Sequence, residues 1–296
     1  MLLKEFVEKS RNELGKIYPV QEAGAITGML CTELLDVQPY THIVEPELEL
    51  PAAAEAEVLS ALERLSGGEP VQYVLGYSFF CTQKFNVNSS VLIPRPETEL
   101  LCEETVKAAM ALCRDRRVCG KGDGPVRILD MCTGSGCIAW TLAGRIPEAD
   151  IVAVDISQDA LDVASSQPLD VKRRPTFVRA DIFDVDAVDA LAGGGFDIIV
   201  SNPPYIMESE KAAMRANVLN YEPGLALFVP DDNPLLFYAA LADMCKKHIH
   251  AGGVGYFEIN ERLGGQVADL FRSRGLENVA VLNDQFGRNR FLKCIR

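Results

Sequence analysis

The feature that most constrains the fold is an alternation of short apolar runs and amphipathic segments from Val126 to the last residue. Strands are expected at 127–131, 151–155, 176–180, 196–201, 253–259, 279–282 and 290–295. Helical patterns lie between them, including 233–250 and 263–274. Strands that alternate with helices favour a mostly parallel sheet with helices on both faces. The sequence therefore predicts an α/β domain over this region.

A glycine-containing loop follows the first of these strands. It reads Asp130-Met131-Cys132-Thr133-Gly134-Ser135-Gly136 and opens a helix. Glycines let a backbone approach a ligand closely, and in open α/β sheets ligands bind beyond the carboxyl ends of the strands. The second strand ends at Asp155, whose carboxylate can accept hydrogen bonds from both hydroxyls of a ribose. Loop and carboxylate together predict an adenosine-type ligand.

The spacing of Gly134, Gly136 and Ala139 also fits a dinucleotide fingerprint, so a hydride-transfer enzyme has to be weighed. Asp130 separates the two possibilities. A carboxylate so near the loop would repel a diphosphate, whereas it would attract the ammonium group of a sulfonium amino acid. After the third strand, Asp181 could accept from the adenine amine, and Ile182 could pack on the ring.

The fourth strand runs directly into Asn202-Pro203-Pro204-Tyr205. Pro203 restricts Asn202 to extended backbone conformations, and the two prolines remove two N–H donors. The Asn202 side-chain oxygen and the Pro203 carbonyl can then accept both hydrogens of one planar –NH₂, while Tyr205 offers a flat face for stacking. Such a nitrogen is a poor nucleophile, and these contacts would orient it and raise its electron density. The motif therefore predicts methyl transfer to an amide or amine nitrogen, assisted mainly by positioning.

The N-terminal region has a different character and is expected to form a small helical bundle. Apolar residues recur at helical spacing from Leu2 to Ile17, and further helices are expected at 21–35 and 52–65. Gly67 and Gly68 are expected to end the last of these. The bundle either stabilises the chain or docks a partner, and the sequence does not separate these roles.

The segment after the bundle predicts a joining hairpin. Short strands are expected around 79–80, 85–88 and 91–93. Pro96 can occupy the first turn of a helix, which is expected to reach about Cys113. Residues 114–124 are polar and glycine-rich, which predicts a surface loop.

Composition limits the class of partner and the compartment. The formal net charge is −13, opposite in sign to that of most nucleic-acid binders, so a basic protein partner fits better. Nine cysteines without C-x-x-C spacing and only three histidines predict reduced thiols in a cytoplasmic protein and no metal site. The N-terminus has no signal-peptide pattern, and no apolar run reaches the roughly 18 residues of a membrane span.

With both motifs in place, the chain resembles the HemK/PrmC enzymes, which methylate the side-chain amide of the glutamine in the Gly-Gly-Gln motif of peptide chain release factors. Asn-Pro-Pro-Tyr marks several amino methyltransferases, whereas Leu92-Ile93-Pro94-Arg95-Pro96-Glu97-Thr98-Glu99 is far more specific to this family. Segments 68–73, 221–223 and 257–259 also fit its pattern, as does the helical N-terminus. The resemblance therefore covers nearly the whole chain.

The resemblance implies a seven-stranded, Rossmann-like class I methyltransferase domain at 96–296. A helical substrate-docking domain at 1–75 and a hairpin linker at 76–95 would precede it. S-adenosylmethionine would be the cofactor and S-adenosylhomocysteine the product. The cofactor loop would be Cys132 to Gly136, the ribose carboxylate Asp155, and the substrate motif Asn202 to Tyr205. The implied protein is a monomer that acts on release factors, with no membrane or direct nucleic-acid partner.

Three positions depart from the family pattern. Ser78 stands where an acidic residue is frequent, and Cys132 and Asn260 stand where glycine is common. None of the three removes a chemical group that the mechanism above requires.

Two alternatives stay open. The first is an adenine or guanine amino methyltransferase on DNA or RNA, in which the same motif grips a flipped base. The net charge opposes it, as does the lack of any basic run beyond residues 172–174. The second is a non-catalytic cofactor-binding module, against which the intact Asn202 to Tyr205 motif argues.

Overall fold

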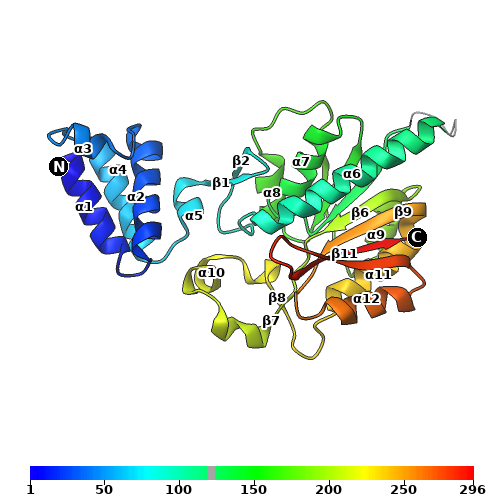
Figure 1. Ribbon diagram of the computed structural model, residues 1–296. Coiled ribbons are helices and arrows are strands. Elements are labelled where there is room, and N and C mark those ends of the chain that lie inside the picture. The colour runs from blue at the N-terminus through cyan, green and yellow to red at the C-terminus, as the bar shows by residue number, and fades with distance from the viewer. Residues whose placement is uncertain (119–123) are drawn as a thin grey trace. The chain divides into compact units, whose positions relative to one another are not determined.

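The computed structural model describes residues 1–118 and 124–296 (Figure 1). The chain divides into two compact units. The first comprises Met1–Gly76 with Arg215–Tyr221, and the second comprises Tyr77–Met214 with Glu222–Arg296. Within the described residues, no helix is both long and apolar enough to cross a membrane.

The first unit is helical, as the apolar spacing predicted. Its helices are α1 (Leu3–Leu14), α2 (Val20–Leu35), α3 (Thr41–Val44), α4 (Ala52–Ser66), α5 (Val71–Leu75) and α10 (Ala216–Tyr221). Leu3, Phe6 and Leu30 are fully buried in its apolar core, where burial of each large side chain contributes about 2 kcal/mol. Gly68 has a φ of 91°, which confirms it as a helix-ending residue.

A tight hairpin opens the second unit. Strands β1 (Tyr77–Phe80) and β2 (Gln83–Asn86) pair antiparallel through a two-residue turn at Cys81 and Thr82. Both turn residues have positive φ, which matches the twist of the flanking strands. The strand predicted over 91–93 is wrong, because these residues have no strand partner. Pro94 follows these residues, and the Ile93 N–H donates to the side chain of Glu222 instead.

The second unit is built on a seven-stranded sheet in the order β10-β11-β9-β6-β3-β4-β5. Neighbouring strands from β9 to β5 pair parallel, whereas β11 pairs antiparallel with both β9 and β10. The strands are β3 (Arg127–Met131), β4 (Asp150–Asp155), β5 (Thr176–Arg179), β6 (Phe196–Ser201), β9 (Ile249–Glu258), β10 (Glu277–Asn283) and β11 (Asn289–Ile295). All seven predicted strands are therefore present, and the α/β fold class is confirmed.

Helices cover both faces of this sheet. Ile128 and Ile198 belong to a core cluster with α6 (Pro96–Val118) and α7 (Cys137–Arg145). Their neighbours Leu129 and Ile199 belong to a second cluster with α9 (Val185–Ala192), α11 (Leu236–His248) and α12 (Gly264–Ser273). Successive strand residues point to opposite faces, so these strands are apolar on both sides. Helix α8 (Gln158–Ser165) packs on β4 and β5.

Some boundaries differ from the prediction. Helix α6 runs to Val118 rather than Cys113, so it takes part of the predicted 114–124 loop, while residues 119–123 lie outside the described part of the chain. Strand β9 begins at Ile249, within the segment expected to be helical. Short elements follow β6 that the sequence did not predict: β7 (Ile206–Met207), η1 (Glu208–Ala213), η2 (Gly224–Ala226) and β8 (Phe228–Val229).

Candidate active site

The glycine loop after β3 has a backbone that needs glycine. Gly134 and Gly136 have φ of 54° and 79°, and Gly136 is the N-cap residue immediately before α7. A Cβ at Gly136 would lie 3.0 Å from Trp140 and 3.1 Å from Ala164. Cys132 also has a positive φ, 62°, and it occupies the position where glycine was expected. The loop therefore keeps its tight turn with cysteine at position 132, and the left-handed backbone of Cys132 is strained.

Asp155 at the end of β4 is tied to this loop. One of its carboxylate oxygens accepts from the Gly134 N–H at 2.9 Å, and the other accepts from the Ser157 N–H at 3.0 Å. Burial raises the pKa of Asp155, and the backbone donors oppose that rise. Each oxygen keeps a further acceptor site, so the carboxylate can still receive ribose hydroxyls.

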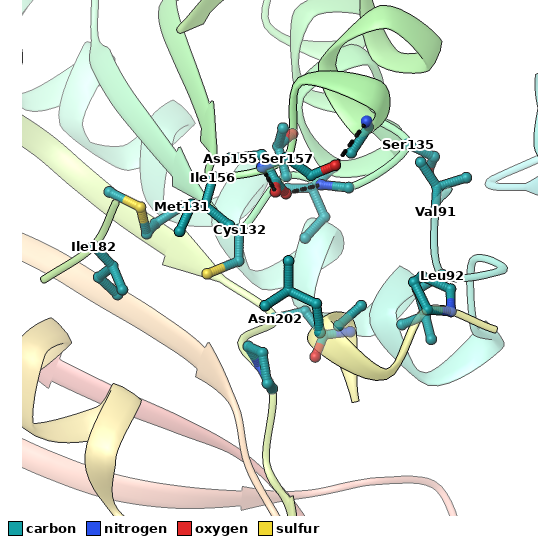
Figure 2. A pocket seen from close by; sticks show the side chains of 18 of the residues that line it. Val91, Leu92, Met131, Cys132, Ser135, Asp155, Ile156, Ser157, Ile182 and Asn202 are labelled. Atoms are coloured by element: carbon teal, nitrogen blue, oxygen red, sulfur yellow. Dashed lines mark hydrogen bonds between the residues drawn. The ribbon is translucent and has the colours of Figure 1, made fainter. Parts of the chain in front are cut away.

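A cavity that is partly open to solvent lies at the carboxyl ends of β3, β4 and β6. Figure 2 shows Cys132, Asp155 and Asn202, which come from the ends of these three strands, grouped around it. Predicted site residues on its wall are Cys132, Thr133, Gly134, Ser135, Asp155, Asp181, Ile182, Asn202 and Pro204. The topology thus brings together residues from four separate predicted segments.

Four predicted residues do not lie on this wall: Asp130, Gly136, Pro203 and Tyr205. Asp130 is fully buried, its Oδ2 accepts from the Thr133 hydroxyl at 2.6 Å, and its Oδ1 has no hydrogen-bond partner among the described residues. Burial raises its pKa to about 7. Asp130 does not line the cavity, so its expected attraction for an ammonium group stays a prediction.

Asn202 and Tyr205 are held by side chains from distant segments. The Asn202 amide donates to the Thr98 hydroxyl at 3.2 Å, and the Tyr205 hydroxyl donates to Glu258 at 2.9 Å. Burial and the Glu258 carboxylate raise the pKa of Tyr205 well above its usual value, so it remains a donor. Tyr205 does not line the cavity, and stacking of its ring on a substrate stays a prediction.

The second face of the cavity comes from the segment that was wrongly predicted as a strand. Val91, Leu92, Pro94 and Arg95 all line it. The buried Glu222 accepts from the Arg95 guanidinium at 2.6 Å and from the Ile93 N–H at 3.2 Å. The Glu222 carboxylate thus accepts from the Ile93 N–H, a backbone donor that would otherwise need a strand partner. It also holds the segment from which Val91, Leu92, Pro94 and Arg95 line the cavity.

Sequence reasoning did not single out Thr98, Glu222 and Glu258, whose side chains hold residues of the cavity wall. All three lie in segments that carried the family resemblance, namely 92–99, 221–223 and 257–259. A polar residue inside an otherwise apolar strand, such as Glu258 after Phe257, was the available signal.

The residues present fit S-adenosylmethionine. Asp155 can receive the ribose hydroxyls, and Ile156 and Ile182 supply apolar surface for an adenine beside Asp181. The glycine loop allows close approach of the backbone.

Comparison with known proteins agrees with this geometry. The methyltransferase small domain matches residues 122–220, and the PrmC N-terminal domain matches residues 5–76. The structure resembles the hMettl16 catalytic domain, solved in complex with the MAT2A 3′UTR hairpin 6, with a TM-score of 0.52 at 14% identity over 83% of this chain and 84% of that chain. That likeness shows the fold alone. Fold, cavity and domain match define an S-adenosylmethionine-dependent methyltransferase.

The relatives narrow the class further. A release factor glutamine methyltransferase of Bacteroides thetaiotaomicron is 38% identical over 286 residues, which covers 97% of each chain. One from Chlorobaculum tepidum is 42% identical over 243 residues, covering 81% of this chain and 79% of the relative. The chain belongs to the release factor glutamine methyltransferase family.

Proposed function

We propose that this enzyme transfers a methyl group to the side-chain amide nitrogen of the glutamine in the Gly-Gly-Gln motif of peptide chain release factors. The observation that carries the proposal is the position of Asn202. It lies on the wall of the cavity that also holds Asp155 and the glycine loop, and its amide –NH₂ is already engaged by Thr98. Its side-chain oxygen is therefore the atom left to accept from a substrate –NH₂.

The residues of this chain act mainly by positioning. S-adenosylmethionine supplies, when bound, a methyl group on a sulfonium sulfur. Asn202 accepts a hydrogen bond from the glutamine amide and orients its nitrogen toward that methyl group. The transfer would replace one hydrogen of the glutamine amide by that methyl group, would leave S-adenosylhomocysteine, and would release the proton to solvent. Orientation of this kind can lower the barrier by several kcal/mol.

We propose that the helical unit contributes to binding of the release factor. Tyr40, Ile43 and Val44, in and beside α3, are 58%, 70% and 64% exposed. Exposed apolar groups in such a cluster are typical of protein-binding surfaces. Ile43→Ser should raise KM for the release factor several-fold without changing cofactor affinity. Val185→Ser, at an exposed residue of α9, is the matched control.

The decisive experiment is intact-protein mass spectrometry of an unmethylated release factor after incubation with the enzyme and S-adenosylmethionine. We expect a mass gain of one CH₂, mapped by fragmentation to the Gly-Gly-Gln glutamine. A release factor with alanine at that glutamine should gain nothing.

Other outcomes would identify the competing functions. Methyl transfer to an adenine- or guanine-containing oligonucleotide, with none to the release factor, would replace this proposal by a nucleic-acid amino methyltransferase. Tight cofactor binding without transfer to either substrate would leave a non-catalytic binding role. The predicted cytoplasmic location and monomeric state remain predictions.

A further inference from the structure

A buried carboxylate lies behind the substrate motif without facing the cavity. Glu258, the last residue of β9, is 1% exposed and does not line the cavity wall. One of its oxygens accepts from the Thr98 hydroxyl at 2.7 Å, and the other accepts from the Tyr205 hydroxyl at 2.9 Å. Burial raises the pKa of Glu258, and the hydrogen bonds from these two hydroxyls oppose that rise. Both hydroxyls donate to the carboxylate, which in its ionised form can only accept.

This fixes the direction of the next hydrogen bond. The Thr98 hydroxyl has a single hydrogen, which it donates to Glu258. Toward Asn202 it can therefore only accept. The Asn202 group within 3.2 Å of Thr98 Oγ1 must then be the –NH₂ rather than the carbonyl oxygen. The other end of the Asn202 amide is the carbonyl oxygen, Oδ1, and it is left for a ligand.

We propose that Glu258 and Thr98 are positioning residues that hold the Asn202 amide in the one orientation that presents Oδ1 to the substrate nitrogen. This inference rests on the proposed function, and it explains why a carboxylate is kept in an apolar strand end. With the amide reversed, Asn202 would present –NH₂ to a substrate –NH₂. Two donors would face each other, and the substrate nitrogen would lose its orienting contact.

The helix that carries Thr98 also carries a matched control. Thr98 and Thr105 are both buried residues of α6. Thr105 donates to the Leu101 carbonyl of its own helix. A valine in place of either threonine keeps the shape and removes the hydroxyl. Only Thr98→Val removes the hydroxyl that hydrogen-bonds both Glu258 and Asn202.

The test uses the full chain with an unmethylated release factor and S-adenosylmethionine. Thr98→Val should lower kcat about 10- to 100-fold, the effect of losing one orienting hydrogen bond, while cofactor affinity and KM for the release factor change little. Thr98→Ser should keep kcat within a few-fold of wild type, and Thr105→Val should match wild type. Glu258→Gln, which places an amide where the acceptor-only carboxylate stood, should lower kcat similarly.

A double-mutant cycle shows whether Thr98 acts through Asn202. In single-turnover assays, adding Thr98→Val to Asn202→Ala should cost little beyond Asn202→Ala alone. Additive losses would overturn the proposal, as would wild-type kcat in Thr98→Val or equal losses in Thr98→Ser and Thr98→Val. These outcomes all require an active wild-type enzyme. Absence of transfer by the wild type would instead overturn the proposed function, and this proposal with it.

Discussion

Gly136 allows the packing at the start of α7 to be tested quantitatively. Its φ is 79°, and an added Cβ would lie 3.0 Å from Trp140, 3.1 Å from Ala164 and 3.3 Å from Phe177. Gly134, two residues earlier, also has a positive φ of 54°, but a Cβ there would meet nothing within 4 Å. Alanine at Gly134 therefore carries the backbone cost alone, and alanine at Gly136 carries both costs.

The expected magnitudes follow from these two terms. A left-handed backbone conformation costs a residue with a Cβ about 1–2 kcal/mol. Forcing a methyl group into a packed interior adds about 1–3 kcal/mol. Gly134→Ala should lower the free energy of unfolding by about 1–2 kcal/mol, and Gly136→Ala should lower it by about 2–5 kcal/mol.

The chain offers a local probe for this measurement. Trp140 is the single tryptophan, it is fully buried in α7, and its indole donates to the Ala164 carbonyl at 2.8 Å. Its fluorescence during urea unfolding, without cofactor, reports on the unit that contains the sheet. Equal destabilisation by the two alanines would refute the steric argument. An unchanged stability in Gly134→Ala would refute the backbone argument.

Three further predictions concern single carboxylates and the substrate motif. Asp155→Ala should weaken cofactor binding at least about 10-fold by calorimetry, because it removes a charged acceptor. Asp159 is an exposed residue of α8, and Asp159→Ala should leave the affinity unchanged. Equal affinities of the two variants would show that Asp155 does not bind the ribose. Asn202→Ala should lower turnover about 100- to 1000-fold with cofactor affinity largely kept, and near-wild-type activity would contradict the amide grip. Burial raises the folded-state pKa of Asp130 from 3.8 to about 7, so ionisation of this group destabilises the folded protein as pH rises through that interval. Asp130→Asn should therefore be more stable than wild type at pH 8, by on the order of 4 kcal/mol, and should lose this advantage toward pH 4. If the stabilities of wild type and Asp130→Asn changed with pH in parallel, a contribution of Asp130 ionisation to stability would be excluded.

The departures from the family pattern have local structural accounts at two positions. Cys132 takes a positive φ at the loop position where glycine was expected. Asn260 donates through its side-chain amide to the Tyr205 carbonyl at 3.2 Å and to Glu210 at 2.9 Å. A glycine at 260 could not make these contacts, so here Asn260 helps hold the backbone after the substrate motif. Ser78 is buried in β1, and nothing in the structure explains its replacement of an acidic residue.

Local chemistry in the sequence determined much of this protein. Apolar strands that alternate with helices can bury both faces only in a covered, mostly parallel sheet, so the sheet and its carboxyl-end site were predictable. The loop from Cys132 to Gly136 and Asn202 directly follow strands, and Asp155 is the last residue of one. Parallel strands end at one edge, and these residues therefore had to meet.

Only the tertiary structure decided which groups face the cavity and which support it. Residues 91–93 have a strand-like composition, but Val91 and Leu92 line the cavity, and Glu222 from a distant segment accepts from the Ile93 N–H in place of a strand partner. Tyr205 directly follows Pro204, which lines the cavity, yet the Tyr205 hydroxyl donates to Glu258. The Thr98–Glu258 hydrogen bond joins residues 160 positions apart. No periodicity or local motif encodes such a pairing, because it exists only once helix α6 and strand β9 have packed together.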